Sequence, residues 1–142
     1  MIALRPTPAA ETFFDTNILL YLLSEDAAKA DRVEELIANG GVISVHVLNE
    51  FATVASRKLG MSWSEIRGVL ASIRAVCEIE PLTVETHDLG IEIAERYGFS
   101  FYDAMILASA LRAGCKILYS EDLQDRQVID RKVRIRHPFG SR

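Results

Sequence analysis

Short apolar segments of strand length alternate with longer segments of helical periodicity, and this alternation restricts the possible folds more than any other feature of the chain. Strands are predicted at residues 11–14, 42–44, 79–82, 116–119 and 133–135. Helices are predicted between them at residues 18–23, from about 26 to the glycines at 40 and 41, 45–58, from 62 onward, 84–97 and 100–113. Strands separated by helices pair in parallel, so the pattern predicts an α/β fold around a mostly parallel sheet.

The length and the N-terminal residues limit the organisation of the chain. A chain of 142 residues is long enough for one compact domain. Residues 1–10 contain two prolines instead of the apolar run of a secretory signal, and no apolar stretch approaches the roughly 20 residues of a membrane span. We therefore expect a flexible leader over residues 1–10, a single domain over residues 11–142 and a cytoplasmic location. Cys77 and Cys115 lack metal-ligand spacing and are expected to be reduced and buried.

Charge is distributed unevenly. The formal net charge is −4, yet the last 20 residues contain six Lys or Arg against two Asp. An acidic body argues against bulk electrostatic binding of nucleic acid, while the basic C-terminal segment permits a local patch that contacts phosphates.

Four acidic residues occupy positions that a parallel sheet can bring to one end. Asp15 follows the first strand and Asp122 follows the strand at 116–119. Ligands of parallel α/β sheets bind outside the carboxyl ends of the strands. Glu50 falls within the apolar stripe of its helix, and Asp103 begins the most apolar helix of the chain.

Each acid also has an ordinary structural interpretation. Asp15 can be an N-cap, Asp122 a turn residue, Asp103 part of an imperfect capping box and Glu50 the partner of an arginine. If one pocket collects all four, however, each pair repels by roughly 3 kcal/mol at about 5 Å. Such a pocket requires protons or divalent cations, and oxygen ligands without His or Cys select Mg²⁺ or Mn²⁺. These ions promote hydrolysis of phosphodiesters, which is nuclease chemistry.

Four segments, in this order, resemble the motifs of a known family. Asp15, Glu50, Asp103 and Asp122 lie, respectively, in the segments Phe13–Leu19, Val47–Phe51, Tyr97–Ala104 and Leu118–Asp125. From about residue 12 to residue 139, the chain resembles the PIN-domain ribonucleases, and within them the VapC-type toxins of toxin–antitoxin pairs.

The resemblance implies a Rossmann-like three-layer α/β/α sandwich with a mostly parallel central sheet, and metal-dependent hydrolysis of RNA. It implies that Asp15, Asp103 and Asp122 bind Mg²⁺ or Mn²⁺, while Glu50 binds a second ion or orients the attacking water. The polar supports that it implies are Thr16, Asn17 and Ser120. The expected partners are an RNA substrate, a cognate antitoxin and a second copy of the chain in a homodimer.

Several assignments stay open at this level. Glu121 is an alternative to its neighbour Asp122 as the fourth acid. Many members of the family have glycine where Arg126 and Arg131 stand, so these arginines alter the turns before the last strand or add phosphate contacts. The basic residues expected either to contact RNA phosphates or to protect an exposed edge strand are Arg126, Arg131, Arg134 and Arg136.

The rival interpretations are a different enzyme and a non-catalytic protein. An aspartate-nucleophile phosphotransferase needs a second Asp two residues after the first, and this chain has Asn17 there. A PIN-like module that binds RNA or protein without cutting would normally have lost one of the acids, whereas all four positions are filled. These patterns do not identify the RNA or choose between Mg²⁺ and Mn²⁺.

Overall fold

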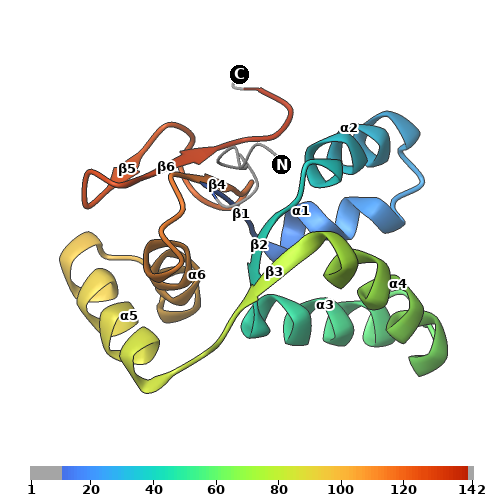
Figure 1. Cartoon of the computed structure of the whole chain (residues 1–142), viewed down its shortest axis with the longest axis horizontal. Coiled ribbons are helices and arrows are strands. Elements are labelled where there is room, and N and C mark those ends of the chain that lie inside the picture. The colour runs from blue at the N-terminus through green and yellow to red at the C-terminus, as the bar shows by residue number, and fades with distance from the viewer. Residues whose placement is uncertain (1–10, 141–142) are drawn as a thin grey trace, which may run out of the picture.

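A six-stranded sheet with helices on both sides forms the part of the chain that the computed structural model describes, residues 11–140 (Figure 1). The leader predicted at residues 1–10 lies outside the described residues. The strands are β1 (Thr12–Phe14), β2 (Gly41–Ser44), β3 (Cys77–Glu80), β4 (Ile117–Tyr119), β5 (Val128–Ile129) and β6 (Val133–Arg136). The helices are α1 (Thr16–Leu20), the 3₁₀ turn η2 (Tyr21–Leu23), α2 (Ala27–Ala38), α3 (Val45–Arg57), α4 (Trp63–Val76), α5 (Val84–Tyr97) and α6 (Phe101–Arg112).

The sheet has the order β3-β2-β1-β4-β6-β5, and every pair in it is parallel except β5 with β6. Helices α5 and α6 lie on one side of the sheet, and α1 and α2 lie on the other (Figure 1). The predicted α/β fold with a mostly parallel sheet is therefore confirmed. Within residues 11–140, no helix is both long and apolar enough to cross a bilayer.

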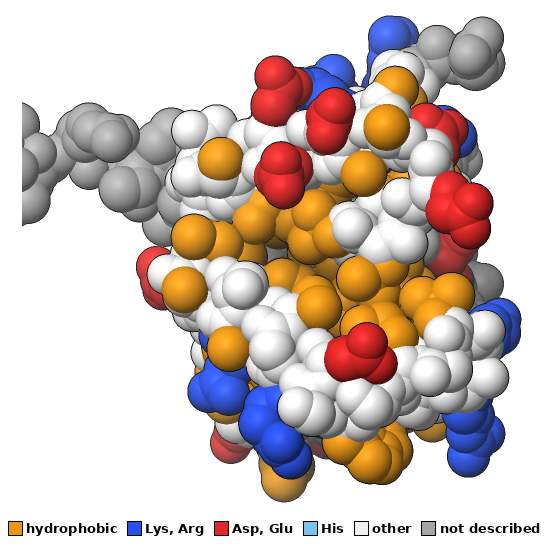
Figure 2. Space-filling view, turned by 90° about the vertical axis from the view of Figure 1, so that its right-hand side faces the viewer, with side chains coloured by type: hydrophobic (Ala, Val, Ile, Leu, Met, Phe, Trp, Pro, Cys, Tyr) orange, Lys and Arg blue, Asp and Glu red, His pale blue; other side chains and the backbone are white. Residues whose placement is uncertain are grey.

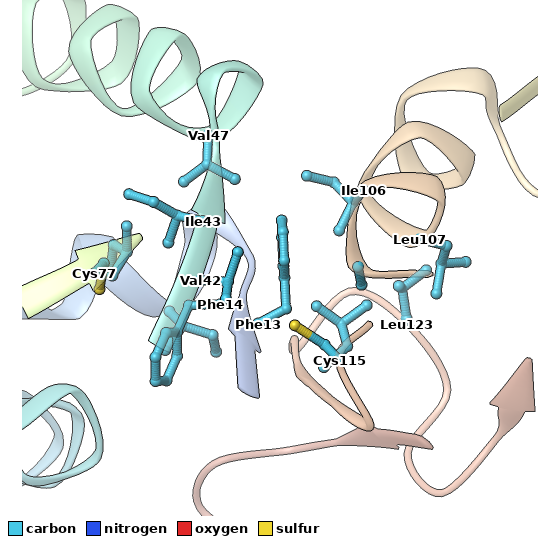
Figure 3. Close-up of a cluster of buried hydrophobic side chains, with 14 of the residues drawn as sticks. Phe13, Phe14, Val42, Ile43, Val47, Cys77, Ile106, Leu107, Cys115 and Leu123 are labelled. Carbon is cyan, nitrogen blue, oxygen red and sulfur yellow. The ribbon is translucent and has the colours of Figure 1, made fainter. Parts of the chain in front are cut away.

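Strand β1 is buried on both faces, as expected for an inner strand of a parallel sheet. Phe13 and Phe14 are fully buried, and because side chains alternate along a strand they point to opposite faces. Phe13 projects toward Ile106 of α6 (Figure 3). The Phe14 ring stacks on Tyr119 of β4 with centroids 5.8 Å apart. This packing sets the position of the residue that follows β1, Asp15.

Local signals account for several helix ends. Ser62 and Glu65 form the reciprocal hydrogen bonds of a capping box before α4, at 3.1 and 2.8 Å. Helix α5 ends at Gly98, whose φ of 78° is the left-handed conformation that glycine adopts without strain. Helix α6 is the most buried helix, as its composition predicts. Cys77 and Cys115 are free and buried, also as predicted.

One strand was predicted at the wrong residues, and another was not predicted. Strand β3 occupies Cys77–Glu80 instead of residues 79–82, because α4 ends directly at Val76 and Pro81 has no N–H for the ladder. The two-residue strand β5 was not predicted, since its length gives no detectable periodicity. Strand β5 forms the edge of the sheet, so β6 is an inner strand and its arginines do not protect an exposed edge.

The β5–β6 hairpin explains the unusual arginines. Its two central residues, Asp130 and Arg131, have φ of 51° and 59°, and Lys132 N donates to Ile129 O at 2.9 Å. These values describe a type I′ turn, in which glycine is favoured. Arg126 also has a positive φ, 72°. Both arginines thus stand where the backbone favours glycine.

Candidate functional site

Asp15 lies at the carboxyl end of β1 and caps α1. Its carboxylate accepts hydrogen bonds from Thr16 N at 2.7 Å and from the Ser120 hydroxyl at 2.8 Å, and Asn17 Nδ2 lies 3.5 Å from Oδ2. Asp15 N donates to Tyr119 O, which ties β1 to the end of β4. Only 5% of Asp15 is exposed. The structure thus holds a buried carboxylate at the junction of two neighbouring parallel strands.

The surroundings of Asp15 destabilise the charged form of its carboxyl group. Burial raises its pKa from 3.8 to about 6, and the hydrogen bonds from Ser120 and Thr16 N oppose this rise. The negative charges of Glu50 and Asp122 raise the pKa further, so both acids lie close enough to act on Asp15. A positive ion is the natural means of stabilising such a group.

The loop after β4 separates the roles of two adjacent acids. Glu121 N donates to Asn17 Oδ1 at 3.3 Å, and the Glu121 carboxylate accepts from the Tyr21 hydroxyl at 2.6 Å. Glu121 is therefore bound to η2. Asp122 is exposed, its N–H donates to Ser120 Oγ at 3.2 Å, and its charge acts on Asp15. This geometry favours Asp122 over Glu121 as the acid beside Asp15.

Glu50 does not lie in a buried stripe, contrary to the sequence-based expectation. Its helix α3 buries Val47, Phe51 and Ala55, whereas Glu50 is exposed. The apolar residue Val54 is only half-buried, which explains why the pattern seemed to enclose the acid. No ion pair with an arginine forms at Glu50 within residues 11–140.

Asp103 occupies the first turn of α6. Its backbone N–H donates to the N-cap hydroxyl of Ser100 at 3.3 Å, so this half of the imperfect capping box forms. The carboxylate itself has no hydrogen bond or ion pair among the described residues, so capping does not account for its charge.

The four acids are not assembled into a ready ligand set. Across the described part of the chain, no three His, Cys, Asp or Glu side chains lie close enough together to hold a metal ion. The donor chemistry nevertheless fits a hard cation, because the groups near Asp15 are carboxylates, hydroxyls and an amide. The buried Thr16 hydroxyl oxygen has no hydrogen-bond partner, although buried polar atoms are normally paired.

The four arginines of the C-terminal segment do not lie together at one end of the sheet. Arg136 pairs with Tyr119 in the β4–β6 register, and its carbonyl accepts from Ser120 N at 3.1 Å, so it lies at the end that carries Asp15. Arg134 pairs with Ile117 at the opposite end. Arg131 lies in the hairpin turn at that same opposite end. Arg126 lies between the two ends, because its N–H donates to the carbonyl of Ile135, which pairs with the middle residue of β4, Leu118.

Two residues that the sequence did not single out for the site hold its loops. Tyr21 binds Glu121, as described above. His137 Nε2 lies 2.9 Å from Leu123 O, and His137 N donates to Asp125 Oδ1 at 2.9 Å. These contacts join residues 12 to 100 positions apart, and no local spacing marks them.

Comparison with known proteins agrees with this architecture. The family model of the PIN domain matches residues 12–129, and a search of curated proteins gives no match. VapC20 of Mycobacterium tuberculosis, described as a toxin that cleaves the sarcin-ricin loop, is 26% identical with a TM-score of 0.63, covering 78% of this chain and 89% of that chain. A toxin–antitoxin complex from Klebsiella pneumoniae has a TM-score of 0.68 at 19% identity, and the match covers 92% of this chain and 99% of that chain. At this identity the match shows the fold alone.

The family predicted from four short motifs is thus found by two independent routes, a family model and the three-dimensional fold. The family model spans every strand of the sheet except β6. The chain belongs to the PIN domain family.

Proposed function

We propose that this protein is a metal-dependent endoribonuclease that hydrolyses RNA phosphodiester bonds through a carboxylate-bound Mg²⁺ or Mn²⁺. The observation that carries the proposal is the buried Asp15 carboxylate, held by Ser120 and Thr16 N and acted on by the charges of Glu50 and Asp122. Burying a charge in this way is unfavourable unless a cation binds there.

Each polar residue of the site has a role in this proposal. Asp15, Asp103 and Asp122 bind the metal directly or through its waters, and Glu50 binds a second ion or orients the attacking water. Ser120 and Asn17 hold the Asp15 carboxylate, and Thr16 supplies a further oxygen. A divalent cation bound there would neutralise the carboxylates and lower the pKa of the attacking water.

The exposure of three of the acids is compatible with these roles. Glu50 and Asp122 are exposed and Asp103 is half-exposed, so their side chains are accessible to an ion from solvent. A cation would offset the repulsion among the like charges.

We also propose that the protein is a toxin with a cognate antitoxin, acts in the cytoplasm and forms a homodimer. The family resemblance supports the antitoxin and the homodimer, and the similar solved structures are described as a toxin and as a toxin–antitoxin complex. The cytoplasmic location is the expectation drawn from the sequence. Apolar surface for a second copy is available at Trp63, Val84 and Tyr102, which are 62%, 71% and 66% exposed.

We propose that a groove between α2 and α4 binds a segment of the antitoxin. Its volume is about 220 Å³, and Figure 2 shows apolar side chains gathered in a hollow on this face. The lining residues are Leu22, Glu34, Ile37, Ala38, Ser72, Ile73 and Val76. The exposed carboxylate of Glu34 in this groove would favour a bound apolar segment that carries a basic residue.

The test is cleavage of a 5′-labelled mixed RNA by purified protein with Mg²⁺, with Mn²⁺ and with EDTA. Wild type is compared with Asp103→Asn, and with Asp31→Asn, which changes an exposed aspartate of α2 in the same way. We expect cleavage to require the metal. Asp103→Asn is expected to reduce cleavage by about 100-fold or more, which is the order of magnitude for loss of one metal ligand or positioned catalytic group. Asp31→Asn is expected to cleave RNA at the wild-type rate.

Both alternatives give distinct results. If folded wild-type protein neither cuts RNA nor binds Mn²⁺, the nuclease proposal fails and a non-catalytic interaction module replaces it. If Asp103→Asn unfolds the protein and thereby abolishes cleavage, Asp103 is a structural residue.

A further inference from the structure

One pocket lies at the opposite end of the sheet from Asp15. It has a volume of about 460 Å³ and lies where β4 and β6 begin and α6 ends. We call it the amino-end pocket, and its lining residues are Leu111, Gly114, Cys115, Lys116, Val128, Arg131, Lys132 and Arg134. Lys116 directly precedes β4, and Ser120 directly follows it, so roughly 10–15 Å of strand separates this pocket from the acidic site.

Four cationic side chains and no acidic one line this pocket. Lys116 Nζ lies 3.2 Å from Glu11 Oε2, which neutralises one of the cations. Arg131, Lys132 and Arg134 have no ion-pair partner within residues 11–140. The protein as a whole is acidic, so this local excess of positive charge is a distinct feature of one surface.

The backbone holds Arg131 at the pocket in an unfavourable conformation. Its φ of 59° is left-handed, where a side chain is strained and glycine is not. The preceding residue, Asp130, is held to α5: its N–H donates to the Tyr97 hydroxyl at 2.9 Å, and its carboxylate binds Tyr97 and Arg96. A turn that is hydrogen-bonded to α5 thus carries a strained arginine at the cationic pocket, and such strain is found at binding sites.

Strand β6 connects the pocket to the acidic end of the sheet. Arg134 and Arg136 are both exposed and are two residues apart, so they lie on the same face, with Cα atoms roughly 6–7 Å apart. Arg134 belongs to the amino-end pocket, and Arg136 lies beside Ser120. The two arginines form a short cationic path from the pocket toward Asp15.

We propose that the amino-end pocket binds phosphate groups of an RNA strand at a distance from the bond that is cut, and that Arg131 and Arg134 are its principal contacts. The planar guanidinium group suits bidentate binding of phosphate oxygens. The path along β6 favours a strand of RNA over an acidic protein, because it continues to the candidate catalytic site. This inference rests on the proposed function for the choice of RNA as ligand.

The test measures binding separately from cleavage. A fluorescently labelled, uncleavable 2′-O-methyl RNA is titrated in EDTA, with fluorescence anisotropy recorded over a range of salt concentrations. The variants are Arg131→Gly and Arg134→Gln, and the matched control is Arg74→Gln, which changes an exposed arginine of α4 that forms no ion pair in the described structure.

We expect each pocket variant to weaken binding and to lower the slope of log K against log salt by about 1, the value for one lost phosphate contact. The control keeps both quantities at wild-type values. Arg131→Gly also relieves the left-handed strain, so its melting temperature is expected to rise by about 2–4 °C while its affinity falls. Opposite changes in stability and affinity exclude unfolding as the cause of lost binding.

Other outcomes overturn the proposal. If both variants bind RNA with the affinity and salt slope of the wild-type protein, the pocket does not contact RNA. The same conclusion follows if the wild-type protein does not bind RNA. If polyglutamate binding falls in the two variants while RNA binding does not, the pocket recognises acidic protein instead. Should wild type fail to cut RNA while the variants still lose RNA affinity, the nuclease proposal fails and the binding site stands.

Discussion

Asp15 shows how much the candidate site depends on one buried charge. The folded protein keeps this carboxyl protonated up to a pH of about 6, whereas the unfolded chain releases the proton near 3.8. Between these values the folded state binds more protons, so the stability contributed by Asp15 is present below the lower pKa and is lost as pH rises through the higher one.

We therefore predict a pH effect on the metal-free protein. In EDTA, the contribution of Asp15 to the free energy of unfolding falls by about 2 kcal/mol between pH 4 and pH 7. Urea unfolding of wild type and Asp15→Asn across this range measures the effect as the difference between their slopes. Equal pH dependence in the two proteins would contradict the prediction.

Arg126 provides a second prediction for a single residue. Its φ of 72° disfavours any side chain, so Arg126→Gly is expected to raise the free energy of unfolding by about 1 kcal/mol. The control is Gln124→Gly in the same loop, where φ is not positive and glycine only increases the freedom of the unfolded chain. Thermal unfolding distinguishes the two, and destabilisation by both substitutions would show that Arg126 is not strained.

Strand β2 supports β1 from the side through a position that only glycine fits. A Cβ added at Gly41 would meet the Phe14 ring at 2.4 Å. Gly41→Ala is therefore expected to lower the free energy of unfolding by about 1–3 kcal/mol, the usual effect of overpacking a core. Because Phe14 precedes Asp15, the same change is expected to reduce RNA cleavage.

A contrasting glycine in α4 serves as the control for this prediction. Nothing lies within 4 Å of a Cβ at the exposed, helical Gly68. Gly68→Ala is therefore expected to raise stability by about 0.5–1 kcal/mol, through helix propensity alone. Chemical denaturation of both variants checks the pair, and equal destabilisation would refute the explanation based on Phe14.

The sequence predicted those elements whose boundaries are local. Helix α5 was predicted at the correct residues because its apolar spacing ends at Gly98, and Asp15 was placed correctly because it follows an apolar strand. Three features could not be predicted from the sequence, because they depend on packing and strand order. They are the exposure of Glu50, the positions of the arginines and the edge position of β5. The role of Glu121 was likewise open until its contact with Tyr21, 100 positions away, was known.

For the whole molecule, the apolar groove between α2 and α4 gives a prediction about assembly. Ala38→Glu places a charge in that groove, so it is expected to abolish copurification with the coexpressed antitoxin while RNA cleavage continues. Ala75→Glu, on an exposed part of α4 that does not line the groove, is the control. An intact complex with Ala38→Glu would place the antitoxin elsewhere.

The hydrogen bond between Ser120 and Asp15 joins residues 105 positions apart. Strand β1, which carries Asp15, pairs with β4 near the end of the chain, so the first acid of the site is made long before the strand that holds it in place. During synthesis on the ribosome, which proceeds from the N-terminus, a nascent chain lacks a formed site until β4 has emerged. Incomplete chains are therefore expected to be inert toward the RNA that surrounds them.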